Sequence, residues 1–139
     1  MEIKTDAPAE GNNFVFATIT GGDVNNFISL GYDNDTNALW GKARLNGTYT
    51  IDNPTQTANR FEYNKIALKY KSGNSKLFLN GVEVDSSTNT YSGGSLNTLG
   101  FEWWDGSYKF IGNVRQLLYF NEALSDAELE YITSADNRS

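Results

Sequence analysis

The chain has 139 residues and a net charge of −6, which suits one domain and disfavours non-specific binding to nucleic acid or anionic membranes. It contains no cysteine and no histidine, which excludes disulfides, thiolate or histidine zinc sites and a serine–histidine–aspartate triad. No run approaches the roughly 18 apolar residues that span a bilayer, so no membrane insertion is expected.

The first thirteen residues, 1–13, are polar and predict an extended lead-in, with room for a short edge strand. They hold no apolar core and are not expected to be a signal peptide. Residues 14–139 follow as one predicted domain. In its first part, β-branched and aromatic runs alternate with turn residues and predict strands at 14–19, 27–32, 38–45 and 48–51.

A meander is predicted over residues 64–85, because apolar residues alternate with polar ones around a turn at 72–75 and an Asn80-Gly81 hairpin turn. Four lysines lie on this meander, and we expect them to form a solvated outer face or edge, with a weak site for anionic glycans as the alternative. They are Lys65, Lys69, Lys71 and Lys76.

The remaining strands are predicted at 96–104, 107–111 and 114–120, with Asp105-Gly106 as a hairpin turn. Strands and turns that recur every 8–12 residues or so are typical of an all-β sandwich or barrel. We expect a set of apolar residues to be buried: Ile66, Leu68, Leu77, Leu79, Phe110, Val114, Leu117 and Leu129.

One helix is predicted at the end of the chain, over residues 126–133. Ser125 and Glu128 have the spacing of a capping box, and Leu124 and Leu129 that of a hydrophobic staple. A helix this short is not stable alone, so it must dock on the sandwich.

Two stretches carry a family likeness, NKIALKYKSGNSKLFLNGVEV at 64–84 and FIGNVRQLLYFNEALSDAEL at 110–129. They resemble the concanavalin A-like, laminin G-like jelly rolls, and their wording is most similar to copies in bacteriophage tail and virion surface proteins. The resemblance implies a two-sheet antiparallel jelly-roll sandwich that binds glycans or protein surfaces. Glycoside hydrolases and polysaccharide lyases share this fold, so the fold alone does not decide the function.

The catalytic residues of the glycoside hydrolases and polysaccharide lyases of this fold are not complete in this sequence. The hydrolases of this fold carry a Glu-x-Asp-x-x-Glu run, and here Glu83 and Asp85 begin such a run but Thr88 stands at its end. No second carboxylate partner is indicated, and the lyases need histidine. We therefore expect a solvated hairpin here and no enzyme.

Asp33 and Asp35 lie in the polar run 33–37 and could offer oxygen ligands to Ca²⁺. Aspartate and asparagine are also the residues from which turns are built, and no distant ligand is identifiable. A plain turn without a cofactor is the first interpretation, and Ca²⁺ the alternative.

The most unusual stretch is FEWWDGSY at 101–108. Adjacent strand residues face opposite sides, so Trp103 and Trp104 cannot both enter the core unless the strand bends, and at least one is expected at the surface or at a rim beside the turn. An exposed indole can stack on a sugar ring. The residues expected to bind its hydroxyl groups are Glu102, Asp105 and Tyr108.

Trp40 is a second candidate, on one face with Lys42 and Arg44. The alternative for both places is packing, with one tryptophan on the sandwich and another in a contact between chains.

The first hypothesis is a non-catalytic carbohydrate-binding or host-surface-adhesion module, virion-borne or extracellular, with a glycan or cell-surface polysaccharide as partner. The second is a structural domain whose aromatic patches pack against sister subunits of a homo-oligomer.

Overall fold

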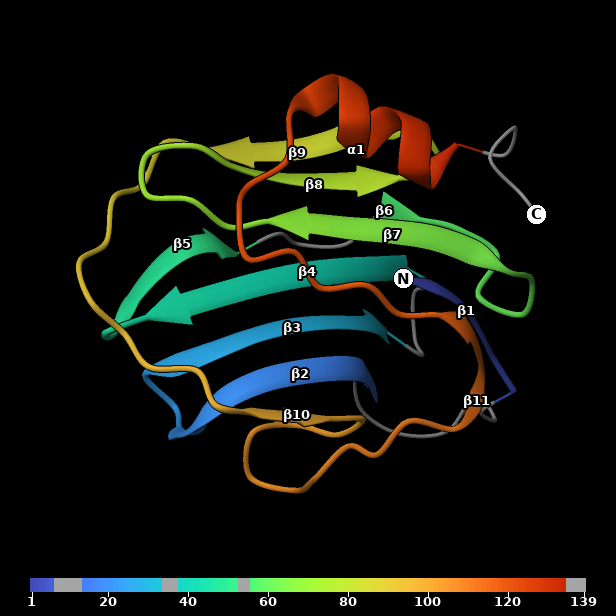
Figure 1. The fold of residues 1–139 in the computed structure, drawn as a ribbon. Coiled ribbons are helices and arrows are strands. Elements are labelled where there is room, and N and C mark those ends of the chain that lie inside the picture. The colour runs from blue at the N-terminus through green and yellow to red at the C-terminus, as the bar shows by residue number, and fades with distance from the viewer. Residues whose placement is uncertain (7–13, 34–37, 53–55, 135–139) are drawn as a thin grey trace.

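The computed structural model describes residues 1–6, 14–33, 38–52 and 56–134, which form two antiparallel sheets and one helix (Figure 1). The first sheet has the order β11-β1-β7-β8-β9, and the second β10-β2-β3-β4-β5, with β6 paired to β4. The elements are β1 (Glu2–Thr5), β2 (Phe14–Asp23), β3 (Asn26–Asp33), β4 (Ala38–Leu45), β5 (Thr48–Asp52), β6 (Gln56–Thr57), β7 (Asn64–Lys69), β8 (Ser75–Leu79), β9 (Val82–Ser87), β10 (Thr98–Gly100), β11 (Gly112–Gln116) and α1 (Asp126–Thr133).

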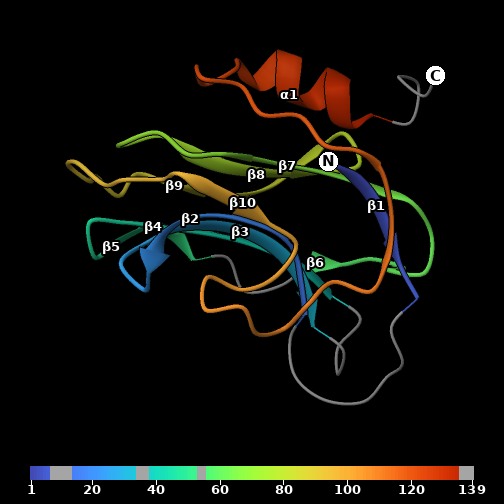
Figure 2. The same ribbon diagram turned by 60° about the horizontal axis from the view of Figure 1, so that its bottom comes forward.

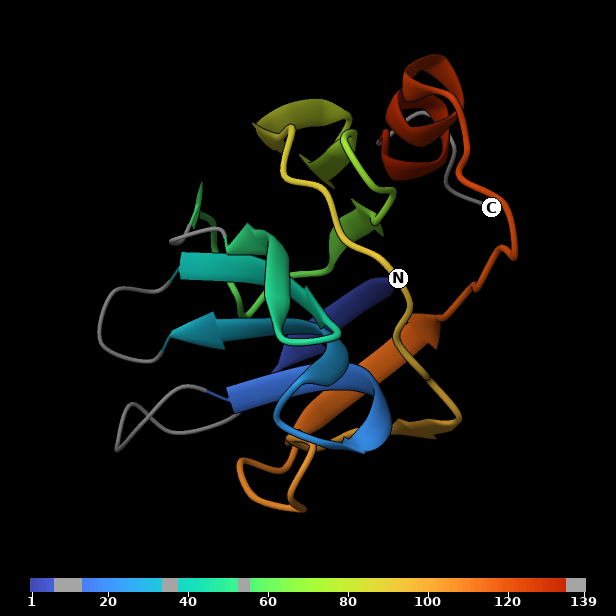
Figure 3. The same ribbon diagram turned by 90° about the vertical axis from the view of Figure 1, so that its left-hand side faces the viewer.

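The two sheets lie as separate layers, with α1 outside the first sheet (Figures 2 and 3). The predicted two-sheet antiparallel sandwich with one C-terminal helix is confirmed. None of the helices among the described residues is long and apolar enough to cross a membrane.

The strands of the first two-thirds of the chain follow the predicted ones closely, and the later ones do not. The strand expected at 96–104 is reduced to β10, the one expected at 107–111 is absent, and the last strand is β11. The lead-in supplies β1, which is an inner strand between β11 and β7 rather than an edge. These differences arise because residues 101–111 leave the sheets and fold over the outside of the second one.

The two Asn-Gly turns have the backbone that their sequence predicts. Asn46 and Gly47 have φ values of 47° and 79°, and Asn80 and Gly81 have 50° and 86°. Positive φ at both central positions is the requirement of a type I′ turn, whose twist matches that of the paired strands.

The core lies between the inner faces of the two sheets, where Ile28, Leu39 and Ile51 meet Ile66 and Leu77. Gly41 allows the sheets to approach at their centre. A Cβ at this position would lie 2.7 Å from Cδ1 of Leu77, which is closer than side chains pack.

Half of the predicted core residues are fully buried, namely Ile66, Leu77, Leu79 and Leu129. Three more are partly buried: Leu68, Phe110 and Leu117. The prediction for Val114 is wrong, since this side chain is 38% exposed. Val114 lies on β11, the edge strand of the first sheet, and pairs with Ile3 of β1. At this edge the second sheet does not cover its side chain.

The expected solvated lysine face is wrong for Lys65 and Lys69, whose exposures are 4% and 7%. The helix docks on this face of the first sheet and covers both side chains. Asp126 accepts hydrogen bonds from Nζ of Lys69 at 2.9 Å and of Lys76 at 2.6 Å, and Lys76 also pairs with Glu83 at 3.1 Å. Lysines of the meander therefore anchor the helix.

The predicted capping box is confirmed. Ser125 Oγ accepts from the backbone N–H of Glu128 at 3.2 Å, and Glu128 Oε2 accepts from the Ser125 N–H at 2.8 Å. We expect Ser125→Ala to lower the free energy of unfolding by about 1 kcal/mol, measured by urea denaturation. Ser86→Ala, an exposed serine in β9, is the matched control. Equal midpoints for the two variants would contradict a role for the cap.

The two lysines hold the pKa of Asp126 below its ordinary value of 3.8, with the hydrogen bond from Lys76 as the largest cause. A folded pKa below the unfolded one gives stability that is present above pH 3.8 and lost as the pH falls below it. Asp126→Asn should therefore be less stable than the wild type at pH 7, and the difference should shrink below pH 3.8.

The measurement is the denaturation midpoint of both proteins between pH 7 and pH 2. The exposed Glu130→Gln is the control on the same helix and should change the midpoint less. A difference between wild type and Asp126→Asn that stays constant with pH would contradict the role of this carboxylate.

Candidate functional site

The segment 101–111 connects β10 to β11 and lies on the outer face of the second sheet, opposite the side that carries the helix (Figure 2). It is tied to this sheet by the N–H of Val15, which donates to the carbonyl of Tyr108 at 3.2 Å. At its end, the ring of Phe110 packs edge-on against Phe16 at 5.6 Å and joins the core. The segment is thus fastened at both its middle and its end.

Trp103 sits on an aromatic cluster of the outer face. Its ring lies 5.0 Å from that of Phe27 and 6.1 Å from that of Trp40, between centroids. Tyr49 extends the cluster, with its ring 6.3 Å from Phe27. Phe27 and Trp40 are 1% and 4% exposed, whereas Trp103 is half-buried and keeps part of its surface in contact with water.

A tight loop holds this tryptophan. The Trp103 N–H donates to the carbonyl of Ser107 at 2.7 Å, and the Gly106 N–H donates to the carbonyl of Trp103 at 2.9 Å. Asp105 Oδ1 accepts from the N–H of Ser107 at 3.0 Å and from its hydroxyl at 2.5 Å. These bonds lower the pKa of Asp105, with the hydroxyl as the largest cause, and keep the exposed carboxylate charged.

Tyr108 has a φ of 51°, in the left-handed region that side chains other than glycine seldom adopt. Such a conformation costs of order 1–3 kcal/mol and persists only where the surroundings fix it, often at functional sites. The Val15 bond to its carbonyl supplies that constraint. The side chain is 41% exposed and available to a ligand.

The structure brings most of the predicted site residues to one place but corrects how they lie. Residues 101–108 are not a strand, so the expected division of the two tryptophans between core and surface does not apply. Both Trp103 and Trp104 are half-buried, as is Glu102.

Trp40 is not a surface platform, because Trp103 covers it. Of the two expected neighbours of Trp40, Lys42 lies beside it, with Nζ 5.3 Å from its ring, whereas the guanidinium of Arg44 lies 5.1 Å from the ring of Tyr49.

Sequence reasoning missed Phe27 and Tyr49. Strand alternation offered an indication for Phe27, since it faces away from its inward neighbour Ile28 and pairs across the ladder with Arg44. Tyr49 also pairs with Arg44, from the other side. The alternation of three strands, considered together, places both aromatic rings on the face that carries Trp40.

Comparison with known proteins adds the family. The model of the Concanavalin A-like lectin/glucanases superfamily matches residues 2–130. The chain belongs to this superfamily. No curated protein matches it.

Three solved structures of one module share the fold. The CBM40 module of the Ruminococcus gnavus IT-sialidase has a TM-score of 0.72 at 20% identity, over 96% of this chain and 80% of its own. The same module bound to α2,3-sialyllactose has a TM-score of 0.72 at 19% identity, over 96% of this chain and 79% of its own. Bound to α2,6-sialyllactose, it has a TM-score of 0.71 at 21% identity, over 96% of this chain and 80% of its own.

Glu83 and Asp85, which begin the incomplete hydrolase-type run, make structural contacts in this protein. Glu83 forms an ion pair with Lys76, which also binds Asp126, so this carboxylate belongs to the network that anchors the helix. Asp85 is partly buried opposite Leu77 in the ladder between β8 and β9.

The Ca²⁺ alternative stays a prediction. Asp33 is the last residue of β3 and partly buried, and Asp35 lies outside the described residues. Within the described part of the chain, no three acidic side chains come together in a way that could hold a metal ion.

The packing of Trp103 gives a test of this site. Trp103→Ala should lower the free energy of unfolding by about 2 kcal/mol, because it uncovers the rings of Phe27 and Trp40. Tyr131→Ala, which removes a 64% exposed ring from the helix, should change stability little. Urea denaturation measures both, and a Trp103→Ala midpoint equal to that of the control would contradict the packing described here.

Proposed function

We propose that the chain is a non-catalytic glycan-binding module whose site is the aromatic turn 101–108 on the outer face of the second sheet. The observation that carries the proposal is the half-exposed pair Trp103 and Trp104, held on a rigid loop beside Tyr108. Indole and phenol faces stack on the apolar C–H faces of sugar rings. A preformed loop loses little entropy when a ligand docks.

The polar groups of the turn fit the same ligand class. Asp105 presents a charged carboxylate with one oxygen bound to Ser107, and its other oxygen is available to sugar hydroxyls. Glu102 offers a second acceptor at the base of the turn. Both are the residue types that accept hydrogen bonds from hydroxyl groups.

The comparisons support a glycan ligand without identifying it. The similar CBM40 structures were solved bound to α2,3- and α2,6-sialyllactose, so sialylated glycans are the first class to test. Lys42 and Arg44 lie on the same face as the aromatic cluster and offer positive charge for an acidic sugar. Neutral glycans without a carboxylate are the contrasting class.

The test is a glycan array probed with the purified chain, with and without Ca²⁺. We expect weak binding at a single site, strengthened when the chain is displayed in several copies. Trp104→Ala and Tyr108→Ala should each weaken binding about tenfold or more, a loss of about 1.4 kcal/mol. Alanine at 108 keeps the left-handed backbone cost, so the comparison isolates the lost ring.

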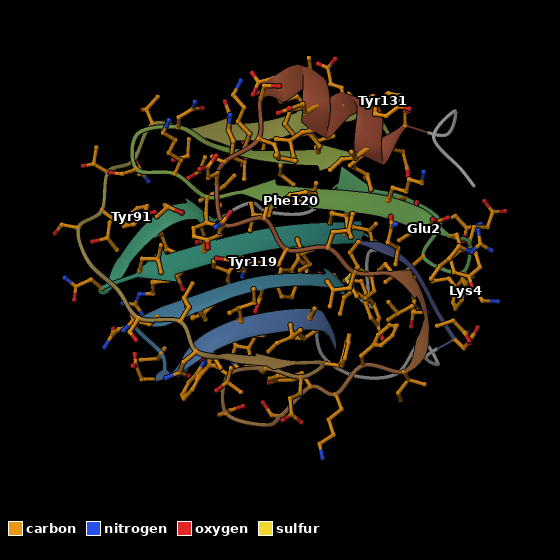
Figure 4. The ribbon with its side chains drawn as sticks, viewed as in Figure 1. Glu2, Lys4, Tyr91, Tyr119, Phe120 and Tyr131 are labelled. Atoms are coloured by element: carbon orange, nitrogen blue, oxygen red, sulfur yellow. The ribbon has the colours of Figure 1, made fainter. Side chains whose placement is uncertain are left out.

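Tyr131→Ala is the control, since this exposed ring lies on α1, on the opposite side of the molecule (Figure 4). It should bind like the wild type. Binding that survives both turn variants would place the site elsewhere. An array without any bound glycan would overturn the proposal.

The biological setting is a further part of the proposal. The similarity of the two motif stretches to virion surface proteins favours a host-surface-adhesion module on a phage tail or virion, or on a secreted protein. A glycan partner on a cell surface fits this setting.

The exposed rings of Tyr119, Phe61 and Tyr131, at 59%, 49% and 64%, favour a second candidate, a structural domain that packs against sister subunits. Light scattering and the glycan array together separate the two: glycan binding by a monomer supports the first, and an oligomer that binds no glycan supports the second.

A further inference from the structure

A cavity of about 560 Å³ opens beside β7, along the face that Figures 1 and 4 turn to the viewer. Residues 117–124, here called the strap, run from β11 to the helix and form its outer wall. The inner wall is apolar and comes from both sheets: Ala17, Ile19, Ile28, Leu30, Leu68 and Leu99.

The cavity is elongated. Seven consecutive residues, 65–71, line it on β7 and just beyond. At the strand rise this corresponds to about 20 Å. An extended hydrocarbon chain fits this length.

Lys65 and Lys69 of β7 line the cavity, as helix residues do, but their ammonium groups have partners at Ser134 and Asp126. Lys69 Nζ pairs with Asp126, and Lys65 Nζ donates to the carbonyl of Ser134 at 3.1 Å. A ligand in the cavity would therefore contact the aliphatic stems of these two lysines and not their ammonium groups. The lining is therefore apolar over most of its length.

Polar groups gather at one end. The hydroxyls of Tyr70 and Tyr119 bond at 2.6 Å, and Tyr91 and Lys71 line the cavity near them. Burial raises the pKa of the Tyr70 hydroxyl. This bond joins the strap to Tyr70, just beyond the end of β7.

The rim of the cavity is apolar and exposed. Leu99 is 52%, Leu118 48% and Phe120 44% exposed, and Figure 4 shows Tyr119 and Phe120 on the side that faces the viewer. Contiguous exposed apolar surface beside an open cavity marks a place where an apolar ligand binds.

We propose that this cavity binds the unbranched alkyl chain of a single-chain amphiphile, with the head group at the tyrosine end. The alkyl chain is the part of the ligand that the cavity binds. Lys71 and Glu122 both line the cavity, so the head group can be a carboxylate of a free acid or a neutral sugar of a glycosylated chain. This inference stands apart from the aromatic turn and does not depend on glycan binding there.

The test is calorimetric titration of the purified chain with dodecanoate and, separately, with dodecyl maltoside, each below its critical micelle concentration. We expect saturable binding of one molecule per chain for at least one of them. Ala17→Phe places a ring in the cavity and should weaken binding at least tenfold. Ala127→Phe adds the same ring at an exposed position of α1 outside the cavity and should bind like the wild type.

Methyl NMR on the wild type locates the ligand even if Ala17→Phe does not fold. The signals of Ile19 and Ile28 should shift, and that of Ile51, which is in the core but does not line the cavity, should not. Failure of both amphiphiles to bind would overturn the inference. So would binding that Ala17→Phe leaves unchanged, or binding that leaves the methyl signals of Ile19 and Ile28 in place.

Discussion

The outer face of the second sheet carries large aromatic side chains that must be kept from water, and Trp103 is the group that covers them. Phe27 and Trp40 lie on neighbouring strands of this face and are almost completely buried beneath it. Covering them requires the chain to leave β10 and fold back, which forms the 101–108 turn. The candidate site is therefore a consequence of a packing requirement, with polar and half-exposed groups added at its edge.

The first sheet meets the same requirement with the helix. Lys65 and Lys69 are buried on its outer face, and their ammonium groups have partners at Ser134 and Asp126. Each sheet thus has its inner face in the core and its outer face covered by a segment from the last third of the chain. β11 and the strap join these two covers, and the strap lines the cavity between the sheets.

Local patterns in the sequence were enough for the fold and the helix. The two Asn-Gly turns and the Ser125–Glu128 box depend on neighbouring residues, and all have the predicted geometry, as do the strands of the first two-thirds of the chain. The lysine face was misjudged because alternation identifies a polar face but not what docks on it. Burial of Val114 was predicted wrongly for a related reason, since a strand pattern does not show that the strand lies at an edge.

The candidate site was only partly predictable. The sequence singled out the WWDG turn by its composition, and the structure brings Trp40 beneath Trp103, although the two lie far apart in the chain. The division of the two tryptophans between core and surface failed, because it assumed a strand where the chain forms a tight loop. The left-handed backbone of Tyr108 could not be predicted, since it depends on the contact with Val15.

The most direct test of the account follows the three indole N–H signals, one per tryptophan, in an NMR titration with α2,3-sialyllactose or with the glycan that binds best on the array. The account predicts that the signals of Trp104 and Trp103 shift with saturation, and that the covered Trp40 moves less. Saturable glycan binding that leaves both turn signals in place would contradict it.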